Sequence, residues 1–168
     1  NNKIIPVEFD LSNKETISNA IKIINSYEQN VNIIVNNAAI MHNRLFQLTK
    51  LDEFYQTFEI NFFNQIFFVQ SLLRNIMKTK NGSIIFLSSS AAQDGNIGRA
   101  AYSSSKAALT SFAKVLSREL GSQKIRVNTI SRGLTDTDMM TGSTAKEYLL
   151  DIVKEIPLKR IGKTLDVA

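Results

Sequence analysis

The sequence predicts an α/β fold built around a parallel sheet. Short apolar runs rich in β-branched residues alternate with longer helical patterns, which is typical of βαβ units. The 168 residues contain no repeat, low-complexity tract or Pro/Gly-rich linker, and 43% of them are hydrophobic, enough for a real core. We therefore expect one domain, or part of one, over residues 1–168.

Each expected strand is a short apolar run, and each expected helix is a longer segment with apolar residues at helical spacing. The expected strands are Ile4–Phe9, Asn32–Val35, Ser83–Leu87 and Ile125–Ile130. The expected helices are Lys14–Tyr27, Leu51–Thr79, Ala101–Leu120 and Ala145–Glu155, with another beginning at the very end of the chain.

Composition and charge argue against several classes of function. The sequence has no cysteine and a single histidine, His42, so we expect neither disulfides nor a metal centre. The net charge of +5 comes from scattered lysines and arginines without a nucleic-acid-binding motif, so no nucleic-acid partner is expected. The most apolar window is too short to cross a bilayer, and the first ten residues do not resemble a signal peptide. We expect a cytoplasmic protein without a membrane partner.

Polar or small residues follow each expected strand. They are Asp10, then Asn36–Ala39, then Ser88–Ser90, then Arg132–Met139. Ligands of open parallel sheets bind beyond the carboxyl ends of the strands, so these four stretches predict a binding site. Taken one at a time, such residues also form ordinary turns and helix caps.

Tyr102 and Lys106 stand four residues apart in the expected helix that follows the third strand. Residues at this spacing lie on the same face of a helix, one turn apart. A fixed positive charge near a phenol favours its ionised form, so the pair is suited to acid–base chemistry. An isolated Tyr/Lys pair at this spacing also arises by chance on helix surfaces.

An ordered set of motifs resembles the short-chain dehydrogenase/reductase family, and within it the 3-oxoacyl carrier-protein reductases. The matching stretches are "NNAA" after the second strand, Asn61 in "EINFF", Ser89 thirteen residues before Tyr102, "YSSSK", and "VNTISRGLTDTDM". The resemblance covers essentially the whole chain. It implies a Rossmann-like, doubly wound parallel sheet with an NAD or NADP cofactor.

The resemblance implies hydride transfer between nicotinamide and a small-molecule carbonyl or secondary alcohol. Tyr102 would be the general acid and base, Lys106 would hold the ribose, Ser89 would donate to the substrate oxygen, and Asn61 would anchor a proton-relay water. The implied cofactor-binding residues are Asp10, Leu11, Asn36, Ala38, Tyr102, Lys106, Gly133 and Thr137. Asp10 has an equal alternative as the cap of the following helix.

The chain departs from the family pattern at three points. Ala39 replaces a usual glycine, and Arg132 stands where a proline is expected, which removes a fixed φ and adds a positive charge. The Gly-rich turn that binds the cofactor pyrophosphate has no counterpart. We therefore expect a truncated fold that lacks its first βα elements and last strand, and we expect these 168 residues alone to be inactive.

Two other classes of function remain open at this point. A dehydrogenase-like fold can serve as a non-catalytic binding module, and nucleotide-sugar epimerases or dehydratases use the same Tyr/Lys pair. The surplus of apolar residues on the helix Leu51–Thr79 predicts a homodimer or homotetramer. The segment around Ala145–Pro157 is expected to act as a lid that sets substrate specificity.

Overall fold

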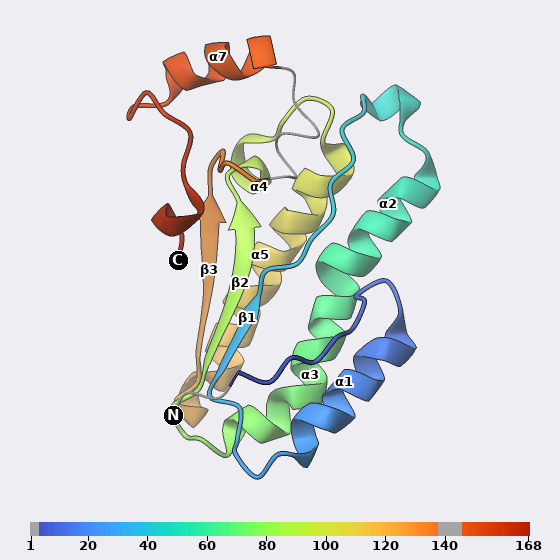
Figure 1. The fold of residues 1–168 in the computed structure, drawn as a ribbon, viewed down its shortest axis with the longest axis vertical. Helices are drawn as coiled ribbons and strands as arrows, with labels where there is room; N and C mark the ends of the chain where they lie inside the picture. The colour runs from blue at the N-terminus through green and yellow to red at the C-terminus, as the bar shows by residue number, and fades with distance from the viewer. Residues whose placement is uncertain (1–3, 138–145) are drawn as a thin grey trace.

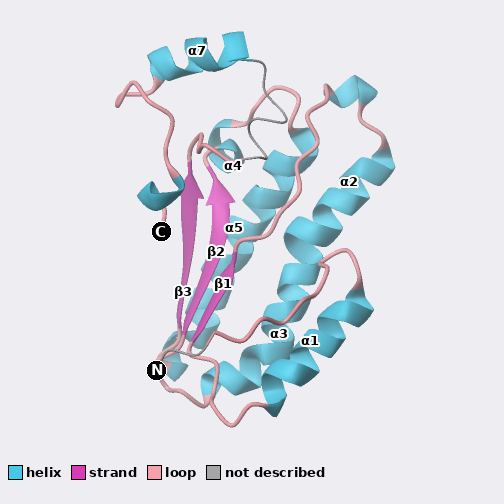
Figure 2. Ribbon diagram, viewed as in Figure 1, coloured by secondary structure: helices cyan, strands magenta, loops and turns pink. Residues whose placement is uncertain are grey.

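The computed structural model describes residues 4–137 and 146–168, and it shows an α/β fold. The described strands β1 (Ile33–Asn36), β2 (Ser83–Ser89) and β3 (Arg126–Arg132) form one parallel sheet in the order β1-β2-β3 (Figure 2). The register pairs Ile34 with Ile84 and then Ile84 with Val127. The expected class of fold is confirmed.

The helices flank the sheet, and those that pack on it lie on one side of it (Figure 1). They are α1 (Lys14–Ser26), α2 (Leu51–Phe58), a π-helical segment (Glu59–Phe63), α3 (Asn64–Met77), α4 (Ala91–Asp94), α5 (Ala100–Leu120) and α7 (Lys146–Glu155). Short 3-10 helices span Phe46–Leu48, Gly121–Gln123 and Thr164–Asp166. Ala145, the expected first residue of the lid helix, lies outside the described residues.

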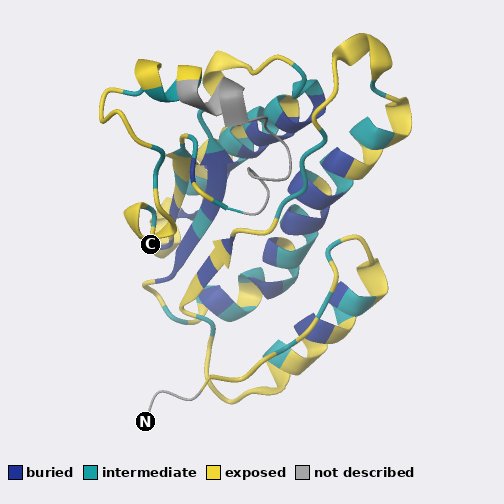
Figure 3. Ribbon diagram, turned by 45° about the horizontal axis from the view of Figure 1, so that its top comes forward, coloured by how far each residue is buried: buried dark blue, intermediate teal, exposed yellow. Residues whose placement is uncertain are grey.

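The core forms between one face of the sheet and the helices α3 and α5. Ile84 and Phe86 of β2 are fully buried, and the Phe86 ring packs edge-on against Phe112 of α5 with centroids 6.0 Å apart. In Figure 3 the buried residues gather where the sheet meets the helices. On the other face, Ile33 and Val35 of β1 are 62% and 56% exposed.

The expected strand Ile4–Phe9 is wrong, because this segment forms no strand. A β-strand needs a hydrogen-bonded neighbour, and no strand of the described residues pairs with it. Phe9 instead stacks on Phe68 of α3, with ring centroids 5.4 Å apart. Of the apolar side chains of this segment, Phe9 packs in this way, whereas Ile4 is 92% exposed.

The expected single helix Leu51–Thr79 is also corrected, because it is interrupted by one π-helical turn at Glu59–Phe63. A π-turn widens the helix locally and is found mostly at functional sites. This turn contains Asn61, so the irregularity falls on a residue that the sequence had singled out. None of the described helices combines the length and the apolar character that a membrane span requires.

Candidate active site

A pocket of about 750 Å³ opens beyond the carboxyl ends of β2 and β3. Four of the predicted site residues line it, namely Ser89, Tyr102, Gly133 and Thr137. Its apolar wall includes Ile152 and Ile156, which belong to α7 and the residue that follows it. The pocket therefore lies where the parallel topology predicts a ligand, with the expected lid segment along one side.

Ser89 and Tyr102 reach this pocket from two different elements. Ser89 is the last residue of β2, and its Oγ accepts a hydrogen bond from the backbone N–H of Ala91 at 3.2 Å. Tyr102 lies in the first turn of α5 and is only 5% exposed. A hydroxyl at the end of a strand and a phenol at the start of a helix thus share one pocket wall.

Lys106 lies behind Tyr102, one helical turn further along α5. Its side chain is almost fully buried, and its Nζ donates a hydrogen bond of 2.6 Å to the carbonyl oxygen of Leu87. The Nζ is 5.9 Å from the centroid of the Tyr102 ring. Burial, and secondly the positive charge of Arg132, lower the pKa of Lys106 to about 8. The ammonium beside the phenol therefore loses its proton at mildly alkaline pH.

Asn61 is completely buried and connects two segments of the site. Its Oδ1 accepts from the backbone N–H of Ile40 at 2.8 Å, and its Nδ2 donates to the carbonyl of Ile40 at 2.9 Å. The same Nδ2 lies 3.2 Å from the Oγ of Ser105, which donates to the carbonyl of Tyr102 at 2.8 Å. The Asn61 side chain does not line the pocket, and it ties the segment after β1 to the turn that carries Tyr102.

The other predicted cofactor residues lie away from this pocket, on the side of β1 and α1. The carbonyl of Leu11 accepts from the Nδ2 of Asn64 at 2.7 Å, and the carbonyl of Ala38 accepts from the Nε2 of Gln65 at 2.8 Å. Asn36 is 7% exposed, and its buried Nδ2 has no partner in the described part of the chain. The site residues thus fall into two groups, with Asp10, Leu11, Asn36 and Ala38 outside the pocket.

Asp10 shapes the turn before α1 without capping the helix. Its Oδ1 accepts a hydrogen bond from the backbone N–H of Ser12 at 2.8 Å. Hydrogen bonding by Ser12, first through its backbone and then through its side chain, lowers the pKa of the Asp10 carboxyl. The helix cap is Asn13, whose Oδ1 accepts from the N–H groups of Glu15 and Thr16. The interpretation of Asp10 as the helix cap is therefore wrong. The cap lies three residues further along the chain, because Asn13 stands directly before the helix.

Sequence reasoning missed the polar residues that support the site from α3 and α5. Asn64 and Gln65 interrupt an apolar helical stretch, as Asn61 does, and both are at most 1% exposed. A buried amide in an apolar helix needs hydrogen-bond partners, so this pattern was the available signal. Ser105 was hidden among three consecutive serines, Ser103–Ser105, and its spacing of three residues from Tyr102 was the available signal.

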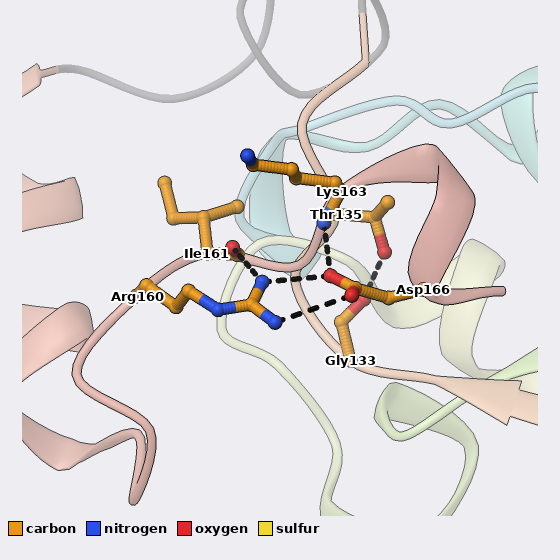
Figure 4. A network of polar contacts seen from close by, with 6 residues as sticks. All are labelled: Gly133, Thr135, Arg160, Ile161, Lys163 and Asp166. Carbon is orange, nitrogen blue, oxygen red and sulfur yellow. Dashed lines mark hydrogen bonds and ion pairs between the residues drawn. The ribbon is translucent and has the colours of Figure 1, made fainter.

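A polar network lies near the C-terminus, in the segment that follows α7 (Figure 4). Arg160 holds Asp166 through two hydrogen bonds of 2.7 and 3.1 Å, and Asp166 also accepts from the N–H of Lys163 at 2.6 Å. These contacts lower the pKa of Asp166 to about 2, the bond from Arg160 having the largest effect. Gly162 donates to the carbonyl of Leu134 at 3.0 Å and thereby joins this network to the loop after β3.

Residues 1–148 match the sequence profile of a family described as short chain dehydrogenase. The chain belongs to the short-chain dehydrogenase family. A reductase of Aquifex aeolicus named 3-oxoacyl-(acyl-carrier-protein) reductase FabG is 33% identical over 162 residues, which are 96% of this chain and 65% of that protein. The human 3-oxoacyl-(acyl-carrier-protein) reductase is 31% identical over 159 residues, 95% of this chain and 65% of its own length.

Membership in the short-chain dehydrogenase family explains why the ordered motifs occur together. A third relative, FabG of Buchnera aphidicola, is 32% identical over 168 residues, 99% of this chain and 68% of that protein. This chain therefore spans about two thirds of the length of the curated relatives that it matches. The expected family is confirmed.

Proposed function

We propose that the protein is an NAD(P)-dependent oxidoreductase that interconverts a carbonyl compound and a secondary alcohol. The observation that carries this proposal is the shared pocket wall of Ser89 and Tyr102, with the ammonium of Lys106 buried behind the phenol. Reduction of a carbonyl needs a proton donor and a hydrogen-bond donor at the oxygen that gains charge. These residues provide both.

Each residue has a separate part in the chemistry. The Ser89 hydroxyl donates to the carbonyl oxygen of the substrate, and Tyr102 transfers its phenolic proton to the same oxygen as the alkoxide develops. The Lys106 charge stabilises the phenolate that remains, and its place is fixed by the bond to Leu87. Asn61 acts through Ser105 on the turn that holds Tyr102, so we assign it a positioning role beside its proposed contact with a relay water.

The residues present fit a nicotinamide nucleotide. Lys106 uses one of its three N–H donors on Leu87, which leaves two for ribose hydroxyls. The unpartnered Nδ2 of Asn36 is a buried donor that lacks an acceptor, as a nucleotide-binding position would. Tyr102, Lys106, Gly133 and Thr137 would hold the nicotinamide half, and Asp10, Leu11, Asn36 and Ala38 the adenosine half. The bound cofactor would supply the hydride.

The decisive experiment replaces Tyr102 with phenylalanine in the full-length protein. We expect Tyr102→Phe to lower kcat by about 100-fold or more, because the variant lacks the proton donor. Cofactor affinity, measured by fluorescence titration, should stay close to the parent value. Tyr55→Phe is the matched control, since Tyr55 is 64% exposed on α2 and outside the pocket.

A Tyr102→Phe variant that retains more than a third of the parent rate would contradict the acid role. Turnover of substrate without net oxidation or reduction of the cofactor would instead favour an epimerase or dehydratase. Cofactor binding with no turnover of any carbonyl or alcohol would favour the non-catalytic binding module. One spectrophotometric assay at 340 nm, combined with product analysis, thus separates the three.

We further propose that residues 1–168 form one dinucleotide-binding domain of a cytoplasmic homodimer or homotetramer. Phe63, on the π-helical turn, is 57% exposed beside the partly buried rings of Phe58 and Phe62. An exposed aromatic cluster on a helix is typical of a subunit interface. Light scattering of the full-length protein tests the assembly, and a monodisperse monomer would contradict it. Cell fractionation tests the compartment.

A further inference from the structure

Arg132 is the last residue of β3, and the strand register places it directly beside Ser89. The pairing of β2 with β3 runs from Ser83 with Arg126 to Ser89 with Arg132. Paired residues of neighbouring strands point to the same face of the sheet, and the strands lie about 4.8 Å apart. Arg132 and Ser89 therefore extend from adjacent positions, and both line the pocket that contains Tyr102.

Arg132 is partly buried, and its guanidinium has no hydrogen-bond or ion-pair partner in the described part of the chain. Its backbone carbonyl accepts from the N–H of Ser90 at 3.0 Å. Asp94 and Glu155 also line the pocket, but both are exposed and neither forms an ion pair with Arg132. Their charges are screened by water far more than that of Arg132.

A second positive charge, that of Lys106, lies near Arg132. The charge of Arg132 is, after burial, the second cause that lowers the pKa of Lys106, so the two cations repel each other electrostatically. A partly buried guanidinium next to another cation is stabilised by an anion. A planar carboxylate matches the fork of N–H donors that a guanidinium presents.

We propose that Arg132 binds a carboxylate of the substrate, so that the substrate of this reductase is an oxo acid and its product a hydroxy acid. The proposal rests on the function proposed above, because it assumes that Ser89 and Tyr102 bind the carbonyl oxygen. Since Arg132 is the direct strand neighbour of Ser89, the carboxylate and the carbonyl must be only a few bonds apart. The relatives that this chain resembles are named for 3-oxoacyl groups on a carrier protein, so a free acid would set this chain apart.

The test compares acids with their neutral esters, which present the same carbonyl without the charge. The probes are pyruvate, acetoacetate and levulinate, each paired with its ethyl ester, so that the distance between carboxylate and carbonyl also varies. The full-length protein is assayed for kcat/KM with each probe, and binding of each probe is measured independently by calorimetry. We expect one of the three acids to be preferred to its ester by about 10- to 100-fold, the range for a hydrogen bond between charged groups.

Arg132→Gln should remove this preference, and Arg132→Lys should retain part of it because the charge is kept without the fork of donors. Arg126→Gln is the matched control, because Arg126 is exposed on the same strand and points to the same face. It lies six residues from Arg132, about 20 Å along the strand, and outside the pocket. The control should leave the ratio of acid to ester within twofold of the parent.

The outcomes separate this inference from the proposed function. Reduction of esters as fast as acids, or an equal effect of Arg132→Gln on both, would overturn the carboxylate site while the reductase function stands. If an acid binds in calorimetry, loses its binding in Arg132→Gln and is never reduced, the carboxylate site stands and the reductase function is wrong. If no acid binds more tightly than its ester, the carboxylate site is wrong.

Discussion

Asn61 and its neighbours Asn64 and Gln65 are three buried amides on one helix, yet they differ in how completely they are hydrogen-bonded. Asn61 uses both its oxygen and its nitrogen, on Ile40 and on Ser105. Asn64 and Gln65 each donate one bond, and the oxygen of each has no partner in the described part of the chain.

This difference separates two regions of the molecule. Near Tyr102, the Asn61 side chain is fully paired, although the buried Oγ of Ser103 and Nε2 of His42 have no partner in the described part of the chain. In the region of β1 and α1, the side chains of Asn36, Asn64 and Gln65 each leave a buried polar atom without a partner there. Buried polar groups are almost always paired in folded proteins. Asn61 therefore links the turn that carries Tyr102 to the segment after β1 through contacts within this chain, whereas the amides of the region proposed for the adenosine half retain unused hydrogen-bonding capacity.

The largest expected effect is on the free energy of unfolding, when Asn61 or Asn64 is replaced with alanine. Asn61→Ala should lower the free energy of unfolding by about 3 kcal/mol, because it leaves the partly buried N–H and C=O of Ile40 without partners and removes the buried contact with Ser105. Asn64→Ala should cost only about 1 kcal/mol, since it removes one bond and one unsatisfied oxygen together. Urea denaturation measures both. Equal losses would mean that the hydrogen bonds of Asn61 and those of Asn64 contribute equally to stability.

A smaller effect, on the pH dependence of stability, sharpens the same comparison. The pKa of Lys106 is near 8 in the folded protein and near 10.5 in the unfolded chain. Below pH 8 the folded protein carries the full cost of the buried ammonium, and that cost falls as the pH rises toward 10.5. The unfolding free energy contributed by this group should therefore increase by about 1 kcal/mol between pH 7 and 9.

Lys106→Met should abolish this increase, whereas Lys114→Met, a change of an exposed lysine on the same helix, should not. Denaturation at a series of pH values measures the slope. An unchanged slope in Lys106→Met would show that the ammonium is not the titrating group. Arg132→Gln should move the increase to higher pH, because it removes the second cause of the lowered pKa.

The site could be predicted from the sequence where order and spacing were sufficient. Ser89 and Tyr102 line one pocket. The strand that ends at Ser89 and the helix that contains Tyr102 have the expected bounds to within two residues. The segment Ile4–Phe9 failed for a physical reason, since an alternating apolar pattern does not supply the neighbouring strand that pairing requires. The contacts of Asn61 were beyond prediction, because its partners Ile40 and Ser105 lie 21 and 44 residues away along the chain.

Arg160 and Asp166 form a network near the C-terminus (Figure 4), and neither residue lines the pocket. Ile156 and Pro157, a few residues before this network, line the pocket. The segment that follows them is held to the loop after β3 by the hydrogen bond from Gly162 to Leu134. Substitutions in this tail would reshape the mouth of the pocket without touching Ser89, Tyr102 or Lys106. Selection can therefore alter the mouth of the pocket while leaving unchanged the residues proposed for proton transfer, so substrate range and chemistry can evolve on separate parts of the chain.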